Sequence, residues 1–167
     1  MHSFFLWLED TALSLWIRET PSVFAFPAIL TAHAIGMGFA VGVNAAMALR
    51  LLGVAPGVPP RELKRFVPFM WFGFWVNTIS GVLLLLAYPT KALTNPVFYL
   101  KIFLITADMW LYTKMGRLMF SAAETPVGTS GFTGHQLAIA SLTCWAAAVT
   151  TGRLLAYTAT HILASHY

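Results

Sequence analysis

Four long runs of apolar residues, separated by short loops rich in Gly, Pro and polar residues, make up most of the chain. They cover about 22–52, 66–87, 97–120 and 136–159. A helix needs ~20 residues, at ~1.5 Å per residue, to cross a hydrocarbon layer of ~30 Å. Each run is long enough, so the pattern predicts four transmembrane helices.

A shorter amphipathic segment over 3–19 precedes the first run. Its apolar positions recur at helical spacing and its polar positions fall between them: Phe5, Leu8, Ala12, Leu15 and Trp16 against Glu9, Asp10 and Arg18. This spacing is typical of a helix that lies in the membrane interface. The sequence therefore predicts an all-α fold, a four-helix transmembrane bundle with an N-terminal interfacial helix, as one integral membrane domain over 1–167.

The composition agrees with a membrane protein and narrows the classes of function. Hydrophobic residues make up 58% of the chain and charged residues 10%, and the mean hydropathy is +0.72. No segment outside the four runs is long enough for a soluble catalytic domain, and no phosphate loop, zinc-protease motif or nucleophile elbow is present. The net charge of +4 would suggest nucleic acid in a soluble protein. Because the basic residues lie beside helix ends, we expect no nucleic-acid partner and interpret them as topology signals.

The basic residues also predict the orientation of the chain. One side of the membrane would carry Arg50, Arg61, Lys64, Arg65, Lys114 and Arg117, and the other Arg18, Lys91, Lys101 and Arg153. Cytoplasmic loops carry the excess of Lys and Arg, and the first of these sets is larger and concentrated in one short loop. The sequence thus predicts a multi-pass protein of a bacterial inner membrane with both termini in the periplasm.

His33 in the first run is the leading candidate for a cofactor ligand. A polar side chain inside a membrane span is costly unless it is paired or functional. His33 shares a helical face with Gly36, Met37, Ala40 and Asn44, and we expect that face to point into the bundle. Neutral imidazole ligates haem iron or copper, and the small neighbouring residues would leave room for a flat macrocycle. The pattern thus indicates haem b held by His33 as the metal ligand.

Two simpler interpretations of the first run remain. His33 would equally suit a hydrogen bond to a neighbouring helix, and Gly38 with Gly42 is the spacing of close helix packing. The second and third runs contain no His, so a second axial His from the same subunit would require the tail that carries His161 to fold back. A five-coordinate haem, or a ligand from another chain, is the simpler arrangement.

Four further residues would complete such a cofactor site. Depth along straight helices places Lys101 and Arg153 near His33, where they would meet the haem propionates or simply anchor the helices at the interface. Trp145 and Phe74 would line the pocket. These assignments, with His33, define the predicted cofactor-binding residues.

A separate polar layer is expected deeper in the bundle. Asp108 is the one acid well inside a run, and Asn44 and Asn77 are predicted to lie at its depth. An ionised carboxylate buried there costs several kcal/mol, so Asp108 should be protonated or paired with Lys101 or Lys114. The layer would serve either as a proton or cation path or as hydrogen bonds that fix the packing of the helices.

The chain resembles an uncharacterised family of small bacterial inner-membrane proteins with four spans. The resemblance covers nearly the whole chain and includes His33-Ala-Ile-Gly36, Asn95-Pro-Val-Phe-Tyr-Leu-Lys101 and, most specifically, Gly152-Arg-Leu-Leu-Ala-Tyr157. It implies the fold and the membrane location, and no activity. The layout is also similar to that of membrane b-type cytochromes.

Together these observations favour a membrane subunit that binds haem b and transfers electrons within or to a larger membrane or periplasmic redox system. Its partners would be the lipid bilayer, other membrane subunits or a second copy of itself, and a quinone or periplasmic redox protein. Two alternatives remain: a cofactor-free structural or assembly subunit, and transport of protons, metal or a small solute through the bundle. Whether the protein is an enzyme stays open.

Overall fold

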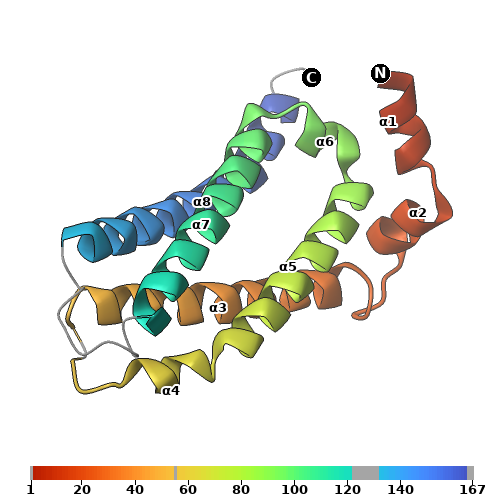
Figure 1. The fold of residues 1–167 in the computed structure, drawn as a ribbon. Coiled ribbons are helices and arrows are strands. Elements are labelled where there is room, and N and C mark those ends of the chain that lie inside the picture. Colours follow the sequence, from red (N-terminus) through yellow and green to blue (C-terminus); the bar gives the residue numbers. More distant parts are fainter. Residues whose placement is uncertain (1, 55, 122–131, 165–167) are drawn as a thin grey trace.

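The computed structural model describes residues 2–54, 56–121 and 132–164, and all regular structure in these ranges is helical (Figure 1). Four long helices form the body of the fold: α3 (Phe26–Leu51), α5 (Val67–Ala87), α7 (Pro96–Ser121) and α8 (Phe132–Ala164). Four short helices flank them: α1 (His2–Glu9), α2 (Ala12–Glu19), α4 (Pro60–Lys64) and α6 (Pro89–Leu93). The predicted all-α class is confirmed.

The N-terminal segment differs from the expected single interfacial helix, because it is divided into α1 and α2. The break falls at Asp10 and Thr11, and Thr11 caps α2 by accepting a hydrogen bond from the backbone N–H of Ser14 at 3.4 Å. A Thr side chain that bonds to the backbone favours a helix start over a helix interior. The sequence pattern did not reveal this break, since the apolar spacing continues across it.

Three helical stretches of the described chain are long and apolar enough to cross a membrane: Phe26–Leu51, Pro60–Ala87 and Thr133–Leu155. Helix α7 has 26 residues but carries four charged side chains, Lys101, Asp108, Lys114 and Arg117, which lower its hydropathy. The outer face of α5 exposes Phe69, Phe72, Trp75 and Ile79 at helical spacing. A water-soluble monomer rarely leaves such a continuous apolar face open. The chain is a multi-pass membrane protein whose apolar outer surface contacts lipid, and a fourth crossing by α7 stays a prediction.

The long helices pack mainly as two pairs, α3 with α5 and α7 with α8, and α3 also contacts α8. Figure 1 shows α4 at one end of the bundle, with α1 and α6 at the other. The main apolar core lies towards the α4 end and contains Met47, Met70, Met115, Met119 and Leu63. A smaller cluster of Ala40, Trp145 and Ala148 lies further along. The end of the bundle near α6 is less filled, and it holds the cavity described below.

Helices α1 and α2 pack against the corner between α5 and α6. Ser14 and Ile17 of α2 are fully buried, and the Ser14 hydroxyl donates to the carbonyl oxygen of Ala87 at 3.4 Å. Glu9 of α1 accepts a hydrogen bond from the backbone N–H of Thr90 at 3.2 Å. These contacts fix α6, which forms one wall of the cavity.

Candidate functional site

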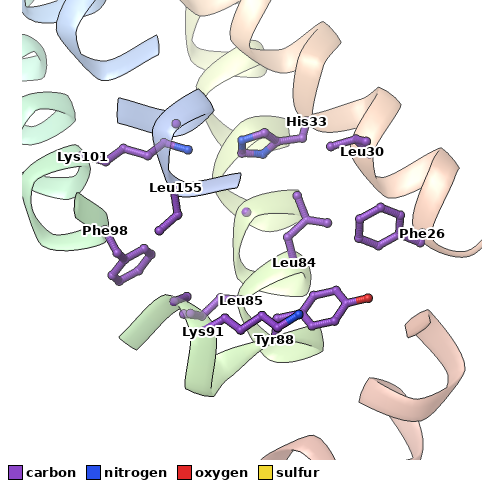
Figure 2. Close-up of a pocket in the computed structure, with 13 residues that line it drawn as sticks. Phe26, Leu30, His33, Leu84, Leu85, Tyr88, Lys91, Phe98, Lys101 and Leu155 are labelled. Atoms are coloured by element: carbon purple, nitrogen blue, oxygen red, sulfur yellow. The ribbon is translucent and has the colours of Figure 1, made fainter. Parts of the chain in front are cut away.

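A cavity of about 630 Å³ lies among α3, α5, α6, α7 and α8. Its walls are mostly apolar, from Phe26, Leu30, Leu84, Leu85, Phe98 and Leu155. The polar side chains that line it are His33, Tyr88, Lys91 and Lys101, and none of the described lining residues is acidic (Figure 2). A volume of this size with apolar walls and few polar groups is typical of small-molecule and cofactor sites.

The imidazole of His33 is held in one tautomer by α5. Its Nδ1 lies 3.0 Å from the backbone carbonyl oxygen of Asn77 and 3.0 Å from the hydroxyl of Ser80. A carbonyl oxygen only accepts, so Nδ1 carries the proton and Nε2 keeps the lone pair in the neutral ring. Gly81 leaves room for the ring, since a Cβ there would lie 3.2 Å from His33 Cε1. His33 therefore presents a basic nitrogen while its orientation is fixed by the partner helix.

Lys101 of α7 enters the same cavity from the opposite side. Figure 2 shows the Lys101 side chain and the His33 ring pointing toward one another. The Lys101 ammonium lies beside α8, where a Cβ on Gly152 would be 3.6 Å from Nζ. In the described part of the chain the one ion pair within 4.0 Å joins Arg65 and Glu62, so Lys101 has no acidic partner there. A half-buried cation among apolar walls favours an anionic group in the cavity.

Tyr88 and Lys91 line the cavity where α5 meets α6. The Lys91 ammonium lies 4.9 Å from the centre of the Tyr88 ring, and the Arg18 guanidinium lies 5.9 Å from that centre. Both are cation–π contacts, so two positive charges lie close to the phenol ring. Lys91 is exposed, so this part of the cavity is positively charged and accessible.

Of the predicted cofactor residues, the structure brings His33 and Lys101 together and places the others elsewhere. Phe74 lies seven residues before the lining residue Gly81 on α5, and Trp145 lies seven before Gly152 on α8. Two helical turns separate each from the cavity by ~10 Å. Phe74 packs against Trp71 and Trp75, with ring centres 5.7 Å apart in both pairs, and Trp145 belongs to the smaller apolar cluster. Neither lines the pocket as predicted.

Arg153 also lies outside the cavity lining. It is exposed, although its neighbour Gly152 faces the cavity. Consecutive helical residues point ~100° apart, so depth alone did not determine the direction of this side chain. The predicted contact of Arg153 with a propionate in this cavity has no support in its position.

The predicted polar layer divides into two clusters. Asn44 and Asp108 do meet: the Asn44 amide donates to Asp108 Oδ2 at 2.5 Å. Asn77 instead lies with His33, and its amide donates to the His33 backbone carbonyl at 2.8 Å. Neither Lys101 nor Lys114 pairs with Asp108, because the carboxyl is bonded to Asn44 and Ser141.

Sequence reasoning missed Ser80 and Ser141, which complete the two clusters. Ser80 contacts the His33 ring, and Ser141 Oγ lies 2.5 Å from Asp108 Oδ1. The available signal was helical spacing: Ser80 is three residues from Asn77 on α5. Small hydroxyl residues are common in membrane helices, so spacing alone does not separate these from Thr143, which is exposed and bonds to its own helix.

The site lacks the usual donor set of a closed metal centre. Among the described residues no three His, Cys, Asp or Glu side chains come together. His33 is the one residue of these four types among the lining residues of the cavity. The chemistry on offer is one oriented imidazole, a lysine ammonium opposite it, and apolar walls.

Comparison with known proteins adds no family to this description. No family model, curated protein or solved structure matches the chain. The fold and site define a class, a helical multi-pass membrane protein with a cavity that opens among its helices and is lined by histidine and lysine.

Proposed function

We propose that the cavity binds haem b through His33 Nε2 and that the protein is an electron-transferring membrane subunit. The observation that carries this proposal is the bond from His33 Nδ1 to the Asn77 carbonyl. Histidines that ligate metals typically donate their other N–H to a backbone carbonyl or carboxylate, which fixes the ring and raises the basicity of the ligating nitrogen. A bound haem would supply one-electron redox chemistry at this position.

The other cavity residues fit the same ligand. Haem b is a flat apolar molecule with two carboxylates, so its site needs apolar walls for the ring and cations for the carboxylates. Lys101 and Lys91 supply the cations, and Leu84, Leu155 and Phe98 supply apolar walls. The protein's residues would thus orient the macrocycle and neutralise its propionates.

We further propose that the protein lies in a bacterial inner membrane with both termini on the periplasmic side. Arg61 and Lys64 lie in α4, Arg65 follows it and Arg50 lies in the last turn of α3, which supports a cytoplasmic location for that end. The cavity would then lie towards the periplasm. A quinone or a periplasmic redox protein would exchange electrons with it there.

The test is a reduced-minus-oxidised absorption spectrum of protein purified in mild detergent from cells supplied with a haem precursor. We expect Soret and α bands in the wild type and in His135→Ala, a matched control because His135 is exposed at the start of α8. His33→Gly should lose the bands and regain them when imidazole is added. A folded wild-type protein without pigment, or full pigment in His33→Gly without imidazole, would overturn the proposal.

A second candidate, a cofactor-free structural subunit, is favoured by the same pair of helices. The Asn77 side-chain amide donates to the His33 backbone carbonyl, and the Asn77 backbone carbonyl accepts from the His33 ring. These two hydrogen bonds join α3 to α5. In that function the His33→Gly change would loosen α3 from α5 and imidazole would restore no spectrum. The pigment measurement therefore separates the two candidates.

A further inference from the structure

Three helices each bring one polar side chain to a single point between the two apolar clusters. These are Asn44 of α3, Asp108 of α7 and Ser141 of α8, and they are 0%, 1% and 0% exposed. Asn44 Nδ2 lies 2.5 Å from Asp108 Oδ2, Ser141 Oγ lies 2.5 Å from Asp108 Oδ1, and Ser141 Oγ lies 3.1 Å from Asn44 Oδ1. Each side chain contacts both of the others, so the contacts close a ring.

The three hydrogen bonds of this ring need three donated protons. The Asn44 amide supplies one towards Asp108, and the Ser141 hydroxyl has only one proton for its two neighbours. The third proton has to come from the carboxyl of Asp108. With it, Asp108 donates to Ser141, Ser141 donates to Asn44, and Asn44 donates back to Asp108.

The ring needs the carboxyl proton of Asp108 in either orientation of the Asn44 amide. If its oxygen and nitrogen exchange places, the amide donates to Ser141, Ser141 donates to Asp108, and Asp108 must donate to the amide oxygen. The direction of the ring reverses and the carboxyl proton is still needed. An ionised carboxylate would leave one contact without a proton and the amide oxygen buried without its bond.

The surroundings offer no positive charge that would hold an ionised carboxylate instead. No Lys, Arg or His of the described chain lies within 4.0 Å of Asp108. On its own helix Lys101 lies two turns away and faces the cavity, and Tyr112 is buried one turn in the other direction. On α8 Ser141 contacts Asp108 directly, and the Trp145 indole and the Cys144 thiol are the other polar groups near it; α3 contributes Asn44. The Trp145 indole N–H points to no acceptor with hydrogen-bond geometry among the described residues, so it makes none of the three contacts of the ring.

We propose that Asn44, Asp108 and Ser141 form a proton-binding site at the centre of the bundle, with Asp108 held as a neutral carboxylic acid. The bound proton closes a ring that joins α3, α7 and α8. It leaves only when a bond between helices is broken, so the site couples one proton to helix packing. This inference is independent of haem, because the site lies outside the cavity.

Infrared spectroscopy of the intact protein tests the proposal directly, because the chain has only two aspartates, Asp10 and Asp108. Protein made with aspartate carrying carbon-13 in its side-chain carboxyl, in an Asp10→Asn background, isolates Asp108. We expect a carboxylic acid C=O band at neutral pH that shifts with the isotope. Isotope-sensitive bands of a carboxylate, with no acid band, would overturn the proposal.

Two variants extend the test to the ring itself. Asp108→Asn keeps one donor and one acceptor at the same place, so it should fold and unfold at the same temperature as the wild type. Ser141→Ala removes two of the three contacts, so it should lower the unfolding temperature and shift the Asp108 acid band. If Ser141→Ala leaves the acid band unmoved, the ring is wrong, whatever the state of Asp108.

Discussion

Gly36 of α3 and Gly73 of α5 face each other where the two backbones leave no space for a side chain. A Cβ on Gly36 would lie 2.8 Å from the Gly73 carbonyl oxygen, and a Cβ on Gly73 would lie 2.7 Å from the Gly36 carbonyl oxygen. Backbone atoms do not yield easily, so Gly36→Ala or Gly73→Ala should force α3 and α5 apart. We expect a loss of about 1–3 kcal/mol in the free energy of unfolding, typical of overpacking. Unfolding in detergent micelles measures it.

Helix α3 also supplies matched controls for these substitutions. A Cβ on Gly38 or Gly42 would meet nothing within 4 Å. Gly38→Ala and Gly42→Ala should therefore change the stability by no more than about 0.5 kcal/mol, or raise it slightly because Ala favours helix. Equal losses at Gly36 and Gly42 would refute the close approach of α3 and α5 described above.

Replacing Ser80 and replacing Asn77 should differ in how strongly each change in stability is coupled to the replacement of His33. Ser80 contacts the imidazole ring, whereas the Asn77 side chain bonds to the His33 backbone carbonyl. A double-mutant cycle between His33→Ala and Ser80→Ala should give a coupling of about 0.5 kcal/mol, the usual size for side-chain hydrogen bonds in membrane proteins. The cycle between His33→Ala and Asn77→Ala should be nearly additive. Thermal unfolding of the single and double variants decides it, and strong coupling only to Asn77 would contradict the geometry.

Lys101 should matter for ligand binding and little for folding. Replacing it with Met removes a half-buried cation that has no acidic partner in the described chain, so the fold should be retained or slightly stabilised. If a propionate bonds to Lys101, the loss of about 1.5–3 kcal/mol would weaken haem binding roughly 10- to 100-fold. The ratio of pigment to protein during detergent washing measures this. Lys114→Met is the control, because Lys114 is exposed and lies over Trp110 at 5.3 Å.

The long helices could be predicted from the sequence because their apolar runs are long and end at recognisable loops. Predicted bounds of 66–87 and 97–120 compare with Val67–Ala87 and Pro96–Ser121 in the structure. The short helices α4 and α6 lie in the loops that separate the predicted apolar runs. Each has five residues beginning at Pro, too few for any periodicity to develop.

The sequence predicted only those parts of the candidate site that follow from how deep a residue lies along its membrane helix. His33 and Lys101 fall at similar depths in straight antiparallel helices, and the structure does bring them to one cavity. Asn77 was placed with Asp108 because its position relative to α3 was unknown. The approach of Gly36 to Gly73 sets that register and puts Asn77 opposite His33, eleven residues or ~16 Å along α3 from Asn44. Hydropathy carries no information on this register, because sliding one apolar helix along another leaves the sequence of each helix, and so its hydropathy pattern, unchanged.

Ile17 should anchor the N-terminal helices to the bundle, although its segment resembles an interfacial helix whose apolar side would enter lipid. Ile17 is completely buried, with 0% of its surface exposed, whereas Leu13 on the same helix is 45% exposed. Ile17→Ala should therefore cost about 2–5 kcal/mol in local stability, and Leu13→Ala much less. Amide hydrogen exchange in detergent measures this local stability. In Ile17→Ala the protection of the amides over 2–19 should fall, while the protection of the α3 amides should be unchanged. Equal loss of protection in both variants would mean that lipid or detergent, rather than contact with α5, holds α2 in place.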